Sequence, residues 1–144
     1  MTAPALASES VAAAPTPGLH VLLVEDNPVN RAIAIRLLEK RGYLVTAVEN
    51  GALAVEITDH ERFDIVLMDV QMPVMDGITA TKSIRDRERD RGGHVPIVAV
   101  TAHALDQDRQ RCLAAGMDDY LPKPIRTPDL FATITKYCQG QATA

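Results

Sequence analysis

Aromatic side chains are scarce in this chain of 144 residues: they make up 3% of it, and none is Trp. Proteins that bind single-stranded nucleic acids usually stack bases on exposed rings, so this scarcity argues against that class. The formal net charge is −4, and an acidic domain is a poor match for DNA or an anionic membrane surface. Four arginines, Arg85, Arg87, Arg89 and Arg91, alternate with acidic residues, a pattern typical of a solvated helix face.

Cysteines and long apolar runs are few as well. Cys112 and Cys138 form no CxxC pattern, so the sequence predicts free thiols and a cytoplasmic protein. No apolar run approaches the roughly 20 residues of a membrane span. Residues 1–18 have neither the basic start nor the apolar core of a signal peptide, and we expect a flexible tail. Residues 19–138 form the predicted domain, and residues 139–144 a C-terminal tail.

Apolar runs and amphipathic stretches alternate along residues 19–138. The runs are rich in Val, Ile and Leu and predict strands, and each is followed by a stretch of helical character. The predicted strands are 19–26, 43–48, 64–69, 95–102 and 117–122, and the predicted helices are 28–41, 50–59, 77–89, 105–115 and 127–138. Apolar strands separated by helices indicate a parallel sheet covered on both faces, a doubly wound α/β domain.

Polar side chains stand where these strands end. Glu25 and Asp26 end the first strand and Asp69 ends the third, while Thr101 ends the fourth and Lys123 follows the fifth. In a parallel sheet these ends share one edge, so the three carboxylates converge if the first and third strands are neighbours, about 4.8 Å apart. Carboxylates that close raise one another's pKa unless a cation lies between them, and hard oxygen ligands suit Mg²⁺.

A carboxylate nucleophile, a Mg²⁺ site, a hydroxyl and an ammonium together predict a phosphoryl-binding site. Each residue also has a plainer explanation by itself. Asp26 or Asp69 could cap a helix, Thr101 could cap a helix or lie at a strand edge, and Lys123 could be a surface lysine. The inference therefore depends on all of them falling at strand ends of one βα array.

The segments VLLVEDN, DIVLMDVQMPVMDG, VPIVAVTA and DDYLPKP together resemble the receiver domain of two-component response regulators, of the type attached to hybrid sensor histidine kinases. The resemblance covers residues 19–138. It implies a flavodoxin-like (βα)5 fold with five parallel strands in the order 2-1-3-4-5. It also implies a phosphoacceptor signalling domain, not an enzyme with a separate substrate, whose phosphoryl donor is a histidine kinase or a histidine phosphotransfer protein. Such a domain catalyses its own phosphorylation and slow dephosphorylation.

The resemblance assigns the metal site and the phosphoacceptor to individual residues. Asp69 matches the phosphoacceptor, and Asp26 matches the direct Mg²⁺ ligand. Glu25 matches the acid that acts on the metal through water, and the backbone carbonyl of Gln71 would complete the metal site.

The resemblance also assigns the groups around the phosphoryl group. Thr101 matches the switch hydroxyl, Lys123 the lysine that contacts phosphate, and Tyr120 the aromatic switch position. The Lys123–Pro124 bond is the expected cis peptide. Gln71 and His103 stand at positions that tune the lifetime of the phosphate, although His103 could equally be a surface loop residue.

The first predicted helix suggests a docking surface. At 100° per residue one face is apolar and predicted to face the core. That face holds Val29, Ile33, Ala34, Leu37 and Leu38. Ile35 falls nearly opposite, beside Arg31, and receivers of this type dock a phosphotransfer helix bundle on this helix. Arg31 and Ile35 are therefore the predicted partner contacts, although a single exposed Ile needs no explanation.

Three other functions fit parts of the pattern. A haloacid-dehalogenase-like phosphatase also uses an aspartyl nucleophile, but it needs a second Asp where this chain has Gln71. A flavodoxin electron carrier would need a Ser/Thr/Gly-rich phosphate loop after the first strand, where this chain has EDNPVN. An interaction module that is never phosphorylated stays open, and a titration with beryllofluoride and Mg²⁺ separates it from a working phosphoacceptor.

Overall fold

The computed structural model describes residues 19–70, 76–102 and 106–143, and in these residues five strands alternate with five helices. The strands are β1 (His20–Val24), β2 (Leu44–Val48), β3 (Ile65–Asp69), β4 (Ile97–Thr101) and β5 (Asp119–Pro122). The helices are α1 (Pro28–Lys40), α2 (Gly51–His60), α3 (Gly77–Arg91), α4 (Asp106–Ala115) and α5 (Thr127–Thr143). All strand pairs are parallel, in the order β2-β1-β3-β4-β5. The predicted flavodoxin-like fold is confirmed.

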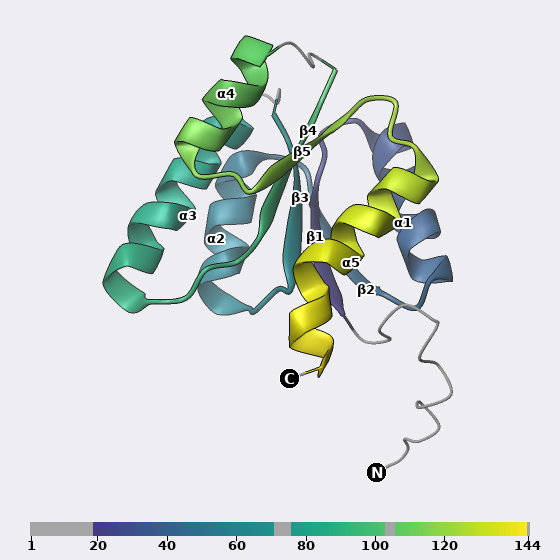
Figure 1. Cartoon of the computed structure of the whole chain (residues 1–144), viewed down its shortest axis with the longest axis horizontal. Coiled ribbons are helices and arrows are strands. Elements are labelled where there is room, and N and C mark those ends of the chain that lie inside the picture. Colours follow the sequence, from purple (N-terminus) through teal and green to yellow (C-terminus); the bar gives the residue numbers. More distant parts are fainter. Residues whose placement is uncertain (1–18, 71–75, 103–105, 144) are drawn as a thin grey trace.

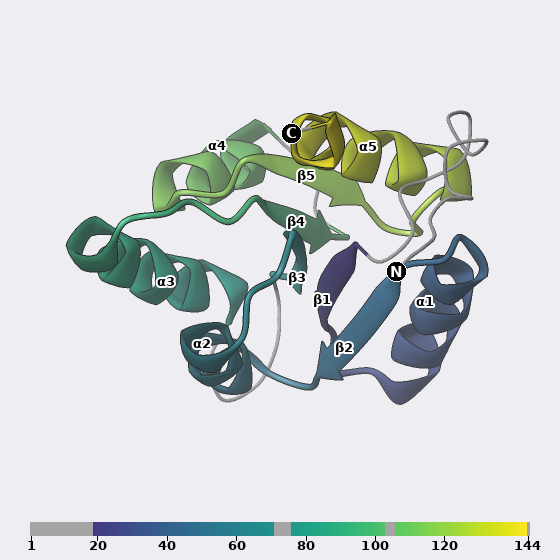
Figure 2. The same cartoon turned by 90° about the horizontal axis from the view of Figure 1, so that it is seen from below.

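Two layers of helices cover the sheet. α1 and α5 lie on one face, and α2, α3 and α4 lie on the other (Figures 1 and 2). β3 is buried along its whole length, and its side chains alternate between two core clusters because successive strand residues point to opposite faces. Ile65 and Leu67 join the cluster under α1 and α5, whereas Val66 and Met68 join the cluster under α2, α3 and α4. These clusters hold the central strand, and with it Asp69, in place.

Asparagine and aspartate caps fix the helix starts next to the carboxyl edge of the sheet. The Asn27 side chain accepts from the backbone N–H groups of Val29 and Asn30, at 2.9 and 3.1 Å, with Pro28 in the first turn. Asp76 caps α3 by accepting from the N–H of Thr79 at 2.8 Å. Side-chain capping of this kind satisfies N–H groups that lack intrahelical partners. The caps are therefore other residues than Asp26 and Asp69, which removes the plainer explanation for both carboxylates.

The expected solvated arginine face is wrong for Arg85, whose side chain is only 10% exposed. Its guanidinium donates to the backbone carbonyls of Gly116 and Val95 and to the carboxylates of Asp118 and Glu88, at 2.7–2.9 Å. The planar fork of five donors allows one arginine to join α3 to the loops before β4 and β5. Alternating charge in the sequence does not reveal these partners, which are up to 33 residues away.

The inward face of α1 differs in part from the predicted one, because only Ala34 and Leu38 of the predicted set pack against the core cluster. Val29 and Ile33 are 65% and 56% exposed, whereas Ala34 and Ile35 pack against the core cluster together with buried Leu38. Ile35 therefore faces the core and is not the exposed contact that we expected. The helix carries two adjoining apolar stripes, and the true inward stripe is rotated from the predicted one by roughly a quarter of a turn.

Two further features complete the fold. α5 continues to Thr143, five residues beyond its predicted end at Cys138. Cys112 and Cys138 are free, as predicted, and both are buried. Among the described residues, no helix is long and apolar enough to cross a membrane.

Candidate functional site

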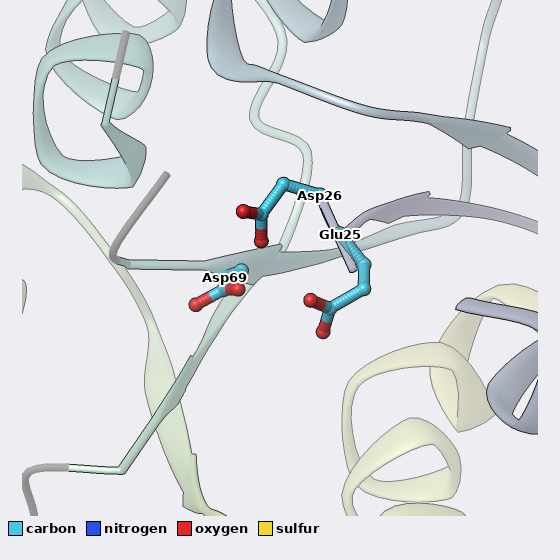
Figure 3. Close-up of side chains that lie close together, drawn as sticks. All are labelled: Glu25, Asp26 and Asp69. Atoms are coloured by element: carbon cyan, nitrogen blue, oxygen red, sulfur yellow. The ribbon is translucent and has the colours of Figure 1, made fainter. Parts of the chain in front are cut away.

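Three carboxylates meet at the carboxyl edge of the sheet. Asp69 is the last residue of β3, and Glu25 and Asp26 follow β1, the neighbouring strand. One oxygen from each of the three lies within 4.8 Å of the others, and Figure 3 shows the side chains gathered around one space. Glu25 and Asp69 are buried, whereas Asp26 is exposed to solvent. The adjacency of β1 and β3 thus produces the predicted convergence.

Lys123 brings a positive charge to the same place. Its Nζ donates to Asp69 Oδ2 at 3.1 Å and lies 3.5 Å from Glu25 Oε1. The backbone N–H of Lys123 donates to the carbonyl of Thr101 at 2.8 Å, which ties the end of β5 to the end of β4. The Lys123–Pro124 peptide bond is cis, as predicted.

The electrostatics of the cluster favour an added cation. Burial raises the pKa of Glu25, and the nearby charge of Asp69 raises it further, against a hydrogen bond from the N–H of Asn27. Burial by itself would lower the pKa of Lys123, but its bonds to Asp69 and Glu25 raise that pKa overall, so the ammonium stays charged. The cluster places three carboxylates beside one ammonium, and a divalent ion with oxygen ligands suits such a group of carboxylates.

The other predicted site residues lie only in part beside the carboxylates. Thr101 ends β4 and is buried beside the site, and Tyr120 lies half-buried on β5. Gln71 and His103 lie outside the described residues. Arg31 is half-buried and donates from Nη1 to the carbonyl oxygen of Glu25 at 2.9 Å, so it supports the loop that carries the carboxylates. Its contact with a partner stays a prediction.

Gly77 contributes to the site, and the sequence analysis missed it. A Cβ at this residue would lie 2.5 Å from the carbonyl oxygen of Asp69 and 2.9 Å from Met68 Cγ, closer than packed atoms allow. The start of α3 therefore approaches the end of β3 as closely as a glycine permits. The Asp76-Gly77 pair was the available signal, since a cap followed by glycine after a buried strand indicates a close approach of the backbone.

A hollow of about 510 Å³ opens beside the carboxylates, between α1 and the segment that joins β5 to α5. We call it the α1 hollow. Its walls are mostly apolar and include Ile33, Leu37 and Ile125, and Glu25 and Lys123 line it as well. The hollow is therefore continuous with the charged site, and the exposed side chain of Ile33 forms part of its wall.

Comparison with known proteins identifies the family. The family model for the response regulator receiver domain matches residues 21–135. The sensor protein GacS of Pseudomonas syringae pv. syringae is 49% identical over 119 residues, which are 82% of this chain and 13% of that protein. The hybrid signal transduction histidine kinase I of Dictyostelium discoideum is 41% identical over 125 residues, 83% of this chain and 7% of that protein. The chain thus spans only a small part of these kinases.

Comparison with solved structures identifies the same family. The receiver domain of the sensor histidine kinase PA1611 from Pseudomonas aeruginosa, with a magnesium ion coordinated in its active site cleft, is 45% identical with a TM-score of 0.78, over 85% of this chain and 98% of that one. The receiver domain of Saccharomyces cerevisiae Ssk1, in complex with the histidine phosphotransfer protein Ypd1, is 37% identical with a TM-score of 0.85. The match covers 89% of this chain and 94% of that one. This chain belongs to the response regulator receiver domain family of two-component signalling.

Proposed function

We propose that this receiver domain accepts a phosphoryl group on Asp69 from a phosphohistidine donor, with Mg²⁺ as cofactor. The observation that carries the proposal is the meeting of three carboxylates within 4.8 Å, with the Lys123 ammonium 3.1 Å from Asp69. An excess of negative charge around a buried carboxylate is costly unless a cation offsets it. Asp26 and Asp69 would hold Mg²⁺ directly, Glu25 through water, and the Gln71 carbonyl would complete the set.

The chemistry follows from the proposed positions. An Asp69 oxygen attacks phosphorus in line, the bond from phosphorus to the imidazole nitrogen breaks, and the product is an acyl phosphate on Asp69. Lys123 and the Thr101 hydroxyl bind the equatorial oxygens, where charge is spread in the transition state. Mg²⁺, when bound, neutralises charge on the same oxygens. The packed strand beneath Asp69 keeps the attacking oxygen in position, which is the contribution of proximity.

We propose that the new phosphoryl charge draws the Thr101 hydroxyl inward and lets Tyr120 change its rotamer. The surface of α4, β5 and α5 then shifts between two conformations that exist before phosphorylation. Gln71 and His103 would tune how quickly water removes the phosphate. Replacing His103 by Ala is expected to change the hydrolysis rate, and an unchanged rate would leave it as a loop residue.

We propose that the donor is a histidine kinase or a histidine phosphotransfer protein that docks on α1. Support comes from the exposed Val29 and Ile33 and from the α1 hollow, which adjoins Lys123. The related Ssk1 receiver domain forms a complex with the phosphotransfer protein Ypd1. The free, buried thiols of Cys112 and Cys138 are compatible with a reducing compartment, and we propose that the domain works in the cytoplasm.

Phosphotransfer profiling against purified histidine kinases and phosphotransfer proteins tests this function, with Asp69→Ala as the matched control. The expected result is transfer from at least one donor to the wild-type domain and none to the variant. A parallel titration with beryllofluoride and Mg²⁺ needs no partner. A wild-type domain that binds no beryllofluoride in the presence of Mg²⁺ would favour an interaction module that is never phosphorylated.

A further inference from the structure

The turn between β1 and α1 carries two of the three clustered carboxylates. Glu25 and Asp26 are adjacent in the chain, and both side chains reach the space around Asp69 from this turn (Figure 3). The N–H of Glu25 ties the turn to β2 by donating to the carbonyl of Val48 at 3.1 Å. Ligands that are held in place before an ion arrives bind it more tightly than ligands that must first be ordered. The contacts that fix this turn therefore affect the metal affinity of the site.

Arg31 holds the same turn from α1. Its Nη1 donates to the carbonyl oxygen of Glu25 at 2.9 Å and lies 3.5 Å from the carbonyl oxygen of Asp26. Because peptide units are planar, the φ and ψ angles of Asp26 set the orientation of one carbonyl relative to the other. A guanidinium that contacts both oxygens therefore restrains the backbone angles that aim the Asp26 carboxylate.

Lys123 and Arg31 act on different atoms of the cluster. Lys123 contacts carboxylate oxygens of Asp69 and Glu25, at 3.1 and 3.5 Å, whereas Arg31 contacts backbone carbonyl oxygens. Charge alone predicts that removing a nearby cation favours the binding of another cation. Loss of the carbonyl contacts predicts the opposite for Arg31, because the turn would then have to be ordered when the ion binds. The sign of the effect on metal affinity distinguishes the two.

We propose that Arg31 is a positioning residue for the metal site, which holds Glu25 and Asp26 in the orientation that binds Mg²⁺. The inference rests on the proposed function, because it concerns the cofactor of the same site. Arg31 is half-buried, and water screens the part of its charge that faces solvent, so we expect the loss of order to outweigh the loss of charge. This role is internal to the domain and does not depend on the partner contact predicted from the sequence.

The test is the dissociation constant for Mg²⁺ alone, followed through the amide resonances of the domain in solution. Arg31→Gln is expected to weaken Mg²⁺ binding about two- to tenfold, the factor that corresponds to the net contribution of one hydrogen bond. Arg31→Lys keeps a charged donor for the carbonyl oxygens, and its affinity should lie between those of the wild type and Arg31→Gln. Arg36→Gln is the matched control, because Arg36 is an exposed arginine of the same helix and its loss changes the net charge equally.

A kinetic measurement separates positioning from a general loss of structure. With acetyl phosphate as the donor, the Mg²⁺ concentration that gives half the maximal rate of phosphorylation should rise in Arg31→Gln by the same factor as the dissociation constant. The rate at saturating Mg²⁺ should match the wild type, because the bound ion then orders the turn. A rate that stays low at every Mg²⁺ concentration would indicate general damage to the domain and would overturn the inference.

The remaining outcomes separate the inference from the function beneath it. Unchanged or tighter Mg²⁺ binding by Arg31→Gln, with a wild-type domain that binds, overturns the role of Arg31 and leaves the proposed function intact. If that variant slows phosphotransfer only from a protein donor, Arg31 is a partner contact instead. Equal weakening by Arg36→Gln also overturns the inference. A wild-type domain that binds no Mg²⁺ overturns the proposed function, and this inference with it.

Discussion

At the scale of single residues, Thr81 stands out as a buried hydroxyl in α3. It is fully buried, and its Oγ1 has no hydrogen-bond partner among the described residues. A buried hydroxyl without a partner carries the cost of its lost hydration. We expect Thr81→Val, which keeps the shape and removes the polar group, to raise the free energy of unfolding by about 1 kcal/mol in urea denaturation.

Thr79 provides the matched control for this substitution. It lies in the same helix but is exposed, so Thr79→Val should change stability by less than about 0.5 kcal/mol. A Thr81→Val variant less stable than the wild type would mean that the hydroxyl has a favourable interaction.

Tyr137 makes a pH-dependent contribution at the other end of the sheet. Its hydroxyl donates to the carbonyl of Asp118 at 2.9 Å and to Asp119 Oδ2 at 3.0 Å. Burial, together with this bond and the two acidic charges, raises the pKa of Tyr137 from 10.0 to about 12. A raised pKa favours the neutral hydroxyl in the folded state, so the stabilisation is complete below pH 10 and is lost as the pH rises toward 12.

We therefore expect the free energy of unfolding to fall between pH 10 and 12, and to fall less steeply in Tyr137→Phe. Cys138 loses stabilisation over a neighbouring range, because burial raises its pKa to about 11. The difference between the two proteins isolates the tyrosine. At neutral pH the variant should be less stable by about 1 kcal/mol, and identical pH profiles would contradict the raised pKa.

The site residues differ in how well the sequence reveals them. Glu25, Asp69 and Lys123 were predictable, because each follows a recognisable apolar strand and parallel strands align their carboxyl ends. Gly77 was signalled only by the cap that precedes it, and the atom that it approaches, the carbonyl of Asp69, belongs to another element. The role of Arg85, which lies outside the site, had no signal in the sequence, because its partner Asp118 is 33 residues away. Local patterns identify where a strand ends but not which distant backbone comes close to it.

At the scale of elements, the junction of α3 with β3 is the most sensitive to substitution. Gly77→Ala would place a Cβ 2.5 Å from the Asp69 carbonyl, so either α3 or the end of β3 must move. Overpacking of this kind costs about 1–3 kcal/mol, and we expect a loss of that size together with weaker beryllofluoride binding. Gly93→Ala is the control, because its Cβ meets open space and only the positive φ is strained.

If Gly93→Ala weakened beryllofluoride binding as much as Gly77→Ala, the effect would be general destabilisation. Gly77→Ala with unchanged binding would show that the approach of α3 does not hold Asp69 in place.

The orientation of α1 gives a second test at this scale. Ile35→Asp should destabilise the domain by about 2 kcal/mol, because it places a charge against the core cluster. Ile33→Asp should change stability by less than about 0.5 kcal/mol, since that side chain is already 56% exposed. Urea denaturation of both variants compares the two faces directly, and the opposite ranking would restore the orientation predicted from the sequence.

Helix periodicity failed here for a physical reason. Apolar residues occupy two adjoining stripes of α1, and the period of 3.6 residues fits either stripe. The choice between them is made by tertiary packing, since the cluster between the sheet, α1 and α5 takes Ala34, Ile35 and Leu38. The helix boundaries were predicted better, because Asn27 and Pro28 are strong local start signals.

At the scale of the whole molecule, the alternation of five apolar runs with helices was enough to predict the layers, whereas the strand order came from family resemblance. That order matters because it makes β1 and β3 neighbours. Their adjacency brings Asp26 and Asp69 together, and the β4–β5 pair brings Lys123 over them. The site is thus a property of the sheet as a whole, and each element contributes only one or two of its groups.

The central claim is that Asp69 is a Mg²⁺-dependent phosphoacceptor. The most direct measurement is intact-protein mass spectrometry after incubation with acetyl phosphate, comparing the wild-type domain with Asp69→Asn, with Mg²⁺ or with EDTA. The account predicts one added phosphoryl group on the wild-type domain with Mg²⁺ and none in the other three samples. Equal phosphorylation of Asp69→Asn, or a wild-type domain that stays unmodified in Mg²⁺, would contradict it.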